Sequence, residues 1–164
     1  MAKTYEPIAS NILTSAAASV TFSSIPQTYT DLVIVTNAAT TSGTAQTEFL
    51  LNGDTGSNYS FNRNHGDGTT PFSSAPTNVA FGQLSWGGYL GSAFGQTVVA
   101  FINNYSNTSV YKHVVSRNSN PAYGTGVVLN MWRSSAAITS ILMRSDAATY
   151  AIGSSFTLYG IKAA

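Results

Sequence analysis

Charge is the scarcest feature of this sequence. Only 8% of its 164 residues are Asp, Glu, Lys or Arg, whereas about 25% is usual for a soluble domain. Seven basic and six acidic residues leave a net charge of +1. Nucleic acid is therefore an unsuitable partner, because binding it needs a basic surface that neutralises several phosphates. A helical bundle or coiled coil is also disfavoured, because its outer faces are normally charged.

Cysteine is absent altogether. The chain can hold no disulfide, thiolate zinc site or cysteine nucleophile, and it tolerates a reducing compartment. Long apolar runs are missing too, since none approaches the ~20 residues that span a bilayer. Residues 1–7 lack the apolar segment of a secretory signal. We therefore expect no membrane partner.

Motifs of catalysis are also lacking. The sequence has neither the Gly-x-Ser-x-Gly turn that presents a serine nucleophile nor a glycine-rich phosphate loop ending in Lys. Its two histidines are His65 and His113, and His113 falls in the alternating pattern of an ordinary strand. The six acidic residues are scattered, so no pair of carboxylates is set up for glycoside hydrolysis. These absences predict a protein that is not an enzyme, with no catalytic residue and no cofactor.

A metal site would draw on Asp54, His65 and Asp67, which lie in turn-rich segments where calcium ligands are common. The repeated-aspartate run of a calcium loop is absent, however, and isolated aspartates usually stabilise turns through their own side chains. We therefore interpret these residues as turn formers and expect no metal.

The polarity of the chain comes from uncharged residues, namely 22 Ser, 20 Thr, 13 Asn and 4 Gln. Together with a hydrophobic fraction of 43%, this composition excludes an intrinsically disordered chain. Apolar residues recur with a period of two, as at Val20 and Phe22, and no apolar stripe of helical spacing persists. The alternating segments predict β-strands at 19–23, 29–36, 47–51, 77–86, 96–103, 109–117, 126–132, 138–144 and 154–161.

Local signals add detail to this pattern of strands. Residues 32–35 are apolar at every position, which is typical of a strand that is covered on both faces. The strand at 47–51 ends at Asn52-Gly53, the strongest short signal for a hairpin, because both turn residues must adopt positive φ. Turn formers dominate from 54 to 76, so only a short strand is expected there.

About eight to ten short strands separated by turns predict an all-β protein, and we favour an antiparallel two-sheet, jelly-roll-like sandwich. The sandwich is expected to be one domain, residues 16–164, behind an N-terminal arm, residues 1–15. The arm is non-periodic and contains a proline, so we expect it to dock onto another chain. Its candidate interface residues are Tyr5, Pro7 and Ile8.

Three aromatic residues are candidates for binding. Trp86 and Tyr89 lie in a glycine-rich segment, and Trp132 ends a predicted strand. Exposed rings of this kind would stack on the sugar rings of a host glycan. Alternatively, Trp86 and Tyr89 would contact a neighbouring subunit, where aromatic residues are enriched. The interpretation that we favour is that Trp86 and Trp132 close the ends of the hydrophobic core.

Eight short stretches form a series along the chain. The first is Tyr-Glu-Pro-Ile-Ala-Ser at 5–10, and the last is Leu-Tyr-Gly-Ile at 158–161. Between them lie stretches at 20–26, 29–32, 49–54, 58–60, 104–108 and 132–134. Their order and combination resemble virion structural proteins of tailed bacteriophages, cyanophages especially. The resemblance covers most of the chain, while residues 63–94 lie outside it.

The resemblance implies a small β-sandwich that is a non-enzymatic component of a phage particle, made in the bacterial cytoplasm and often assembled as a homotrimer. Proteins of this kind serve as capsid cement (decoration) proteins or as tail and fibre parts. A cement protein would bridge neighbouring major capsid subunits and so stabilise the shell, and this is the function that we expect. The alternative is a tail-tip or fibre module that binds a host glycan.

Overall fold

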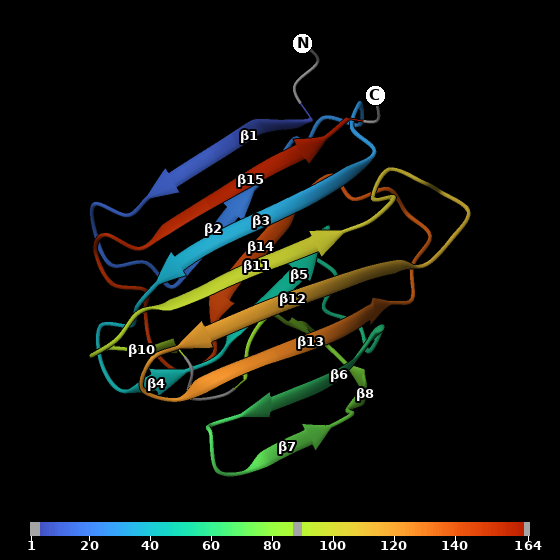
Figure 1. Ribbon diagram of the computed structural model, residues 1–164. Helices are drawn as coiled ribbons and strands as arrows, with labels where there is room; N and C mark the ends of the chain where they lie inside the picture. Colours follow the sequence, from blue (N-terminus) through green and yellow to red (C-terminus); the bar gives the residue numbers. More distant parts are fainter. Residues whose placement is uncertain (1–3, 87–89, 163–164) are drawn as a thin grey trace.

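The computed structural model describes residues 4–86 and 90–162, which form strands and connecting loops without any helix (Figure 1). The strands are β1 (Tyr5–Ile12), β2 (Ser19–Phe22), β3 (Asp31–Ala38), β4 (Thr44–Ala45), β5 (Thr47–Leu51), β6 (Tyr59–Gly66), β7 (Pro71–Ser74), β8 (Thr77–Val79), β9 (Gly82–Gln83), β10 (Leu90–Gly91), β11 (Gln96–Ile102), β12 (Lys112–Asn120), β13 (Gly124–Trp132), β14 (Ile141–Ser145) and β15 (Ser155–Ile161). These fifteen strands in the described part of the chain exceed the number expected, because six of them are only two to four residues long.

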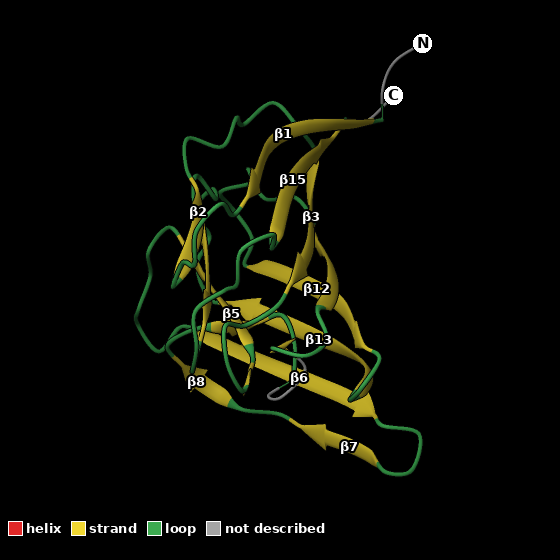
Figure 2. Cartoon of the chain, turned by 90° about the vertical axis from the view of Figure 1, so that its left-hand side faces the viewer, coloured by secondary structure: helices red, strands yellow, loops and turns green. Residues whose placement is uncertain are grey.

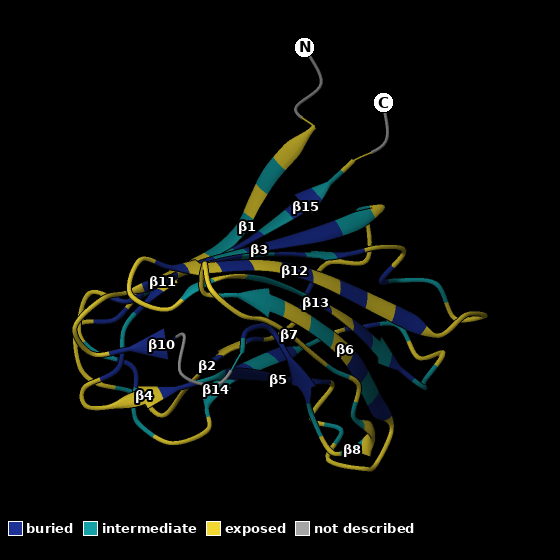
Figure 3. Ribbon diagram, turned by 60° about the horizontal axis from the view of Figure 1, so that its bottom comes forward, coloured by how far each residue is buried: buried dark blue, intermediate teal, exposed yellow. Residues whose placement is uncertain are grey.

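Two antiparallel sheets lie face to face (Figure 2). The large sheet has nine strands in the order β1-β15-β3-β11-β12-β13-β6-β7, with β8 also paired to β6. The small sheet has the order β2-β14-β5-β9, and a separate pairing of β10 with β4 lies at one end of the molecule (Figure 3). The prediction of an all-β, antiparallel sandwich is confirmed.

The core lies between the two sheets and consists of the residues that each strand turns inward. Leu32 and Ile34 of β3 belong to the same buried cluster as Phe49 and Leu51 of β5, and all four are at most 1% exposed. Along β12, buried and exposed residues alternate without interruption, as Figure 3 shows. Each large apolar side chain in this layer contributes about 1.5–3 kcal/mol by its removal from water.

The N-terminal segment is part of this sandwich. Tyr5–Ile12 pairs with β15 from one end to the other, so over these residues the expected arm is the edge strand of the large sheet. The partner strand comes from the other end of the chain, so no local pattern in the sequence points to this pairing. A bulge between Pro7 and Ala9 interrupts the ladder, since proline has no N–H group to donate.

The Tyr29 side chain contacts both terminal strands, β1 and β15. Its ring lies over Gly160 of β15, where an added Cβ atom would come within 2.3 Å of the ring, so glycine is required there. Its hydroxyl donates a 3.2 Å hydrogen bond to Glu6 Oε2. The same carboxylate pairs with Lys162 Nζ at 3.0 Å. Side chains therefore hold β1 to the sheet in addition to the backbone ladder.

The Asn52-Gly53 turn forms as expected, but it does not join a hairpin. Both residues have positive φ, 53° and 68°. The strand before them, β5, pairs with β14 and β9 rather than with the next long strand, β6. The Asn52 side chain instead accepts hydrogen bonds from the backbone N–H groups of Thr139 and Ser140. The turn thus anchors the loop that leads into β14.

Candidate functional site

The large sheet has one covered face and one open face. Figure 2 shows the small sheet and most connecting loops on one side of it. On the other side, which Figure 1 views from the front, no described segment lies over the strands from β15 to β13. We call this open side the outer face.

Apolar residues form a continuous line across the outer face. The cross-strand registers place one residue from each of six neighbouring strands in this line, which we call the apolar row: Pro7, Tyr159, Val33, Phe101, Val115 and Leu129. At a strand spacing of ~4.8 Å, the apolar row is about 24 Å long. Leu129 is 48% exposed and Val115 is 37% exposed. Val33, in the middle of the row, is only 3% exposed. The row therefore presents apolar surface to water mainly at Val115 and Leu129 and at Pro7.

The residues beside the apolar row become more polar toward one end of the strands. Two residues further along the strands, the same face carries Val35, Val99 and Val127, together with Arg117. Beyond them comes a fully polar row, which consists of Ser155, Asn37, Thr97, Ser119 and Thr125. Within it, the Thr97 hydroxyl donates to Asn37 Oδ1 over 2.8 Å. The outer face is thus apolar in the middle and hydrogen-bonding at one end of its strands.

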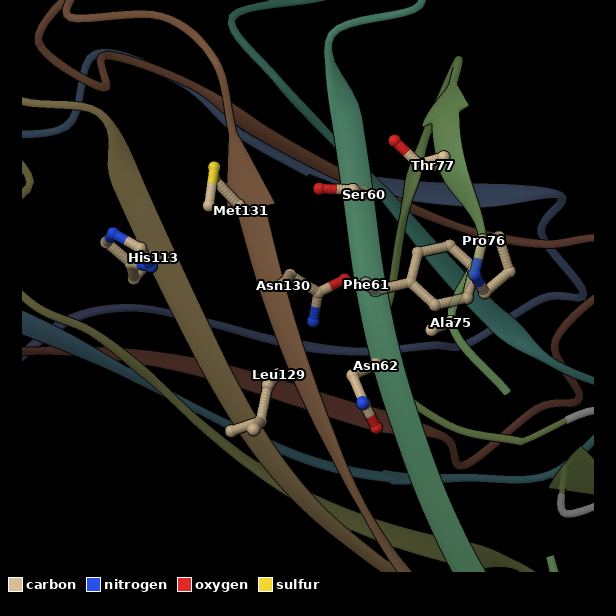
Figure 4. A pocket seen from close by; sticks show the side chains of 10 residues that line it. All are labelled: Ser60, Phe61, Asn62, Ala75, Pro76, Thr77, His113, Leu129, Asn130 and Met131. Atoms are coloured by element: carbon tan, nitrogen blue, oxygen red, sulfur yellow. The ribbon is translucent and has the colours of Figure 1, made fainter. Parts of the chain in front are cut away.

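Two hollows lie where the apolar row meets β6 and β7. The first, of about 320 Å³, is lined by Leu129, Met131 and His113 on one side and by Ala75, Pro76 and Thr77 on the other (Figure 4). The second, of about 800 Å³, is wide and shallow, and its lining residues are Asn64, His65, Gly66, Pro71, Phe72, Ser73, Arg117, Thr125, Gly126 and Val127. Both hollows continue the outer face rather than enter the core.

Charge is almost missing from this surface. In the described strands β3, β11, β12 and β13, the outward positions hold two charged residues, Asp31 and Arg117. Asp31 lies at the start of β3, and its Oδ1 accepts a 2.7 Å hydrogen bond from the Asn104 N–H. The Arg117 guanidinium lies 5.8 Å from the centre of the Phe101 ring, a cation–π contact within the face. Burial of the face would therefore cost little in lost ion hydration.

The predicted interface residues of the N-terminal segment separate onto two sides of the sheet. Tyr5 is 53% exposed, and Pro7 is exposed in the apolar row. Ile8, which falls at the bulge, instead packs against the core of its own sandwich. Tyr5 and Pro7 thus remain available for contact with another molecule, whereas Ile8 does not.

Trp86 lies in a compact aromatic cluster where the sandwich ends at β6 and β7. Its ring stacks on His65 at 4.2 Å and meets Phe72 at 4.3 Å. The Arg63 guanidinium lies 3.9 Å from the Trp86 ring centre. Burial, and then the neighbouring Arg63 charge, lower the pKa of His65 below its ordinary value. Trp86 is thus half-buried among side chains of β6 and β7, and its closing of the core stays a prediction, while Tyr89 lies outside the described residues.

Trp132 is a core residue and offers no surface for a sugar. It is only 3% exposed and stacks on Tyr59, with ring centres 6.3 Å apart. Its Nε1 donates a 2.6 Å hydrogen bond to Asp54 Oδ2. Burial raises the pKa of Asp54, but the hydrogen bonds from Trp132, Asn58 and Gly56 outweigh it, so the pKa lies below its usual range. A stacking role for Trp132 is wrong because its ring closes the core beneath the Asp54 turn.

The three residues considered for a metal site do not come together. Within residues 4–86 and 90–162, no group of three His, Asp or Glu side chains could hold a metal ion. Asp67 Oδ1 accepts hydrogen bonds from the Thr69 and Thr70 N–H groups, at 2.8 and 2.7 Å, which lower its pKa to about 2. Asp67 thus acts as a turn residue. In the same part of the chain, no helix is long and apolar enough to cross a membrane.

Comparison with known proteins found no relative of this chain. No protein-family model, no curated protein and no solved structure matches the chain. The site must therefore be judged from its own residues. Its main element, the apolar row, was missing from the sequence-based candidates, although the uninterrupted apolar run at 32–35 was a signal of it.

Proposed function

We propose that this chain is a non-enzymatic structural protein of a tailed-bacteriophage particle. The finer proposal is a capsid cement protein that assembles as a homotrimer and bridges neighbouring major capsid subunits in the virion. The observation that carries the proposal is the open, apolar and nearly uncharged outer face of the large sheet. A surface of this kind is typical of a subunit of a larger assembly.

The physical action of such a protein is to add buried surface where capsid subunits meet. Each Å² of apolar surface removed from water contributes about 25 cal/mol. A small rigid sandwich is suited to this task, because little of that free energy is lost in ordering the protein itself. The net charge of +1 leaves little electrostatic repulsion among many copies packed on one shell.

Particle stability tests the cement proposal directly. Particles assembled with and without this protein would be heated, and DNA release would be followed with an intercalating dye. We expect particles that lack the protein to release DNA at a lower temperature, and re-addition of purified protein to restore the difference. Unchanged release, together with no binding of the protein to the shell, would contradict a cement function.

The alternative, a tail-tip or fibre module for a host glycan, is favoured by one observation. Phe72 is 42% exposed, packs on His65 at 4.9 Å, and borders the wide hollow that also contains Arg117. An apolar ring beside polar side chains is a suitable platform for a sugar. The Phe72→Ala variant should then lose binding to host cells or to a glycan array. Wild-type protein that binds no glycan would remove this alternative.

A further inference from the structure

We infer that the partner of the outer face is the outer face of another copy of this chain, so that the apolar rows of neighbouring copies bury one another. The inference rests on the proposed function, because it names a surface through which copies of the chain meet in the proposed particle. It also makes a narrower claim, which can be tested without any phage particle.

The size of the outer face fits a stable protein interface. Seven strands, from β1 to β6 in sheet order, are seven to nine residues long, and each turns about half of its residues to this side. With strands ~4.8 Å apart and residues ~3.3 Å apart, the face measures about 34 by 23 Å, or roughly 800 Å². That is about the area that each partner contributes to an interface of standard size. One face against another would therefore suffice for stable association.

The pattern of residues on the face also fits an interface. Interfaces have an apolar centre that excludes water and a polar rim that hydrogen-bonds at the edge. Here the centre holds Phe101, Val115 and Leu129 of the apolar row, and Asn37, Thr97 and Ser119 form a polar edge at one end of the strands. Two sheet faces pack about 10 Å apart when their side chains interdigitate. The small sheet already shows that the inner face of the same sheet packs in this way.

The near absence of charge favours a second copy over an unlike partner. A charged partner is recognised by opposite charges, and the centre of the outer face supplies only Arg117. The exposed Arg117 lies next to the apolar row, with its guanidinium 5.8 Å from the centre of the Phe101 ring. An apolar and nearly uncharged surface is complementary to another surface of the same kind, which every copy of the chain provides.

The edges of the large sheet are unsuited to joining copies. The terminal strand β1 contains Pro7 and a bulge, and the opposite edge strand β7 begins at Pro71. Proline cannot donate to a ladder, and a bulge turns an edge away from regular pairing. Continuation of the sheet from one copy into the next is thus hindered at both ends. The outer face remains as the surface through which copies associate.

The test measures the mass of the purified full chain by analytical ultracentrifugation over a wide range of concentrations. Leu129→Lys and Val115→Lys place a cation in the apolar row at exposed positions, where the folded chain tolerates it. Thr21→Lys is the matched control, because it adds the same charge at an exposed strand position on the small sheet. We expect the wild type and the control to self-associate alike, and each row variant to dissociate about a hundredfold more readily.

Because the chain has no cysteine, single-cysteine variants give an independent readout. A short thiol-reactive cross-linker should join two copies of Val115→Cys and leave Thr21→Cys uncoupled. A monomeric wild type would overturn the inference, as would self-association that both row variants leave unchanged. A monomer that still stabilises particles would contradict only this inference. Chains that associate through the outer face without affecting particles would contradict only the cement function.

Discussion

The two faces of the large sheet consist of similar residues and differ in what lies against them. Along β3, Leu32 and Ile34 point into the core, while Val33 and Val35 point to the outer face. The small sheet covers the inner set. On the outer face Val33 is also only 3% exposed, but Leu129 and Val115 of the same face remain 48% and 37% exposed. The inner face therefore stabilises the fold, whereas the outer face carries more apolar surface than the folding of a single copy requires.

The largest expected effect is on the inner face. Ile34→Ala leaves a cavity beside the buried cluster, where Ile34 is 1% exposed. We expect the free energy of unfolding to fall by about 3 kcal/mol, because a close-packed layer collapses only partly around a deleted side chain. Urea-induced unfolding, followed by intrinsic fluorescence, measures the change. A loss below about 1 kcal/mol would contradict the view that this face stabilises the fold.

A smaller effect is expected at the end of the core, where Trp132 meets the Asp54 turn. Trp132→Phe keeps an aromatic ring beside Tyr59 but removes the Nε1 donor to Asp54. The loss of a hydrogen bond to a carboxylate should lower the free energy of unfolding by about 2 kcal/mol. Trp86→Phe, which keeps a ring in the cluster at the other tryptophan, is the control and should cost less. Equal losses of unfolding free energy in the two variants would show that the smaller ring, rather than the lost hydrogen bond to Asp54, causes the effect.

The pH dependence of stability should reflect the protonation of His65, whose side chain lies on the covered side of the large sheet. Since the pKa of His65 is lowered from 6.5 in the folded chain, the unfolded chain binds more protons in the interval below that value. The free energy of unfolding should therefore fall as the pH drops below 6.5, and His65→Gln should remove this decrease. The carboxylates of Asp54 and Asp67 have lowered pKa values, so they change the free energy of unfolding only at a pH below their ordinary pKa of 3.8. An unchanged profile in His65→Gln would contradict this assignment.

The smallest effect on folding is expected on the outer face. Leu129→Ala removes a side chain that is 48% exposed, so the free energy of unfolding of dilute protein should change by less than about 0.5 kcal/mol. Self-association, measured in parallel by ultracentrifugation, should weaken. A large loss of stability at low concentration would mean that the outer face supports the single copy, and the contrast between the two faces would fail.

Strand positions were readable from the sequence wherever alternation was regular. The strand predicted at 47–51 is β5 with the same ends, and that predicted at 96–103 is β11 to within one residue. The segment around His65-Gly66 was interpreted as turn-forming, yet both residues lie in β6. There Gly66 pairs with Thr125 and His65 with Gly126. Pairing with β13 overrides the local preference for a turn, and only the folded chain supplies that partner.

The sheet that a strand joins was harder to predict than the position of the strand in the sequence. Residues 77–86 were expected to form one strand, but β8 pairs with β6 in the large sheet and β9 pairs with β5 in the small one. The chain crosses between the sheets over two residues, after Asn78 adopts a positive φ of 56°. In the same way, Trp86 and Trp132 were identifiable as candidates, but their neighbours His65 and Asp54 come from other segments.

By itself, the sequence determined the all-β class, the uncharged polar surface and the positions of most strands, because period-two alternation and turn chemistry act between near neighbours. The tertiary structure alone decided that the N-terminal segment is an edge strand, that Trp132 meets Asp54, and that six apolar residues from six strands line up on an open face. These features depend on register between strands distant in the chain. Register is set by the packing of a whole layer, so no single segment encodes it.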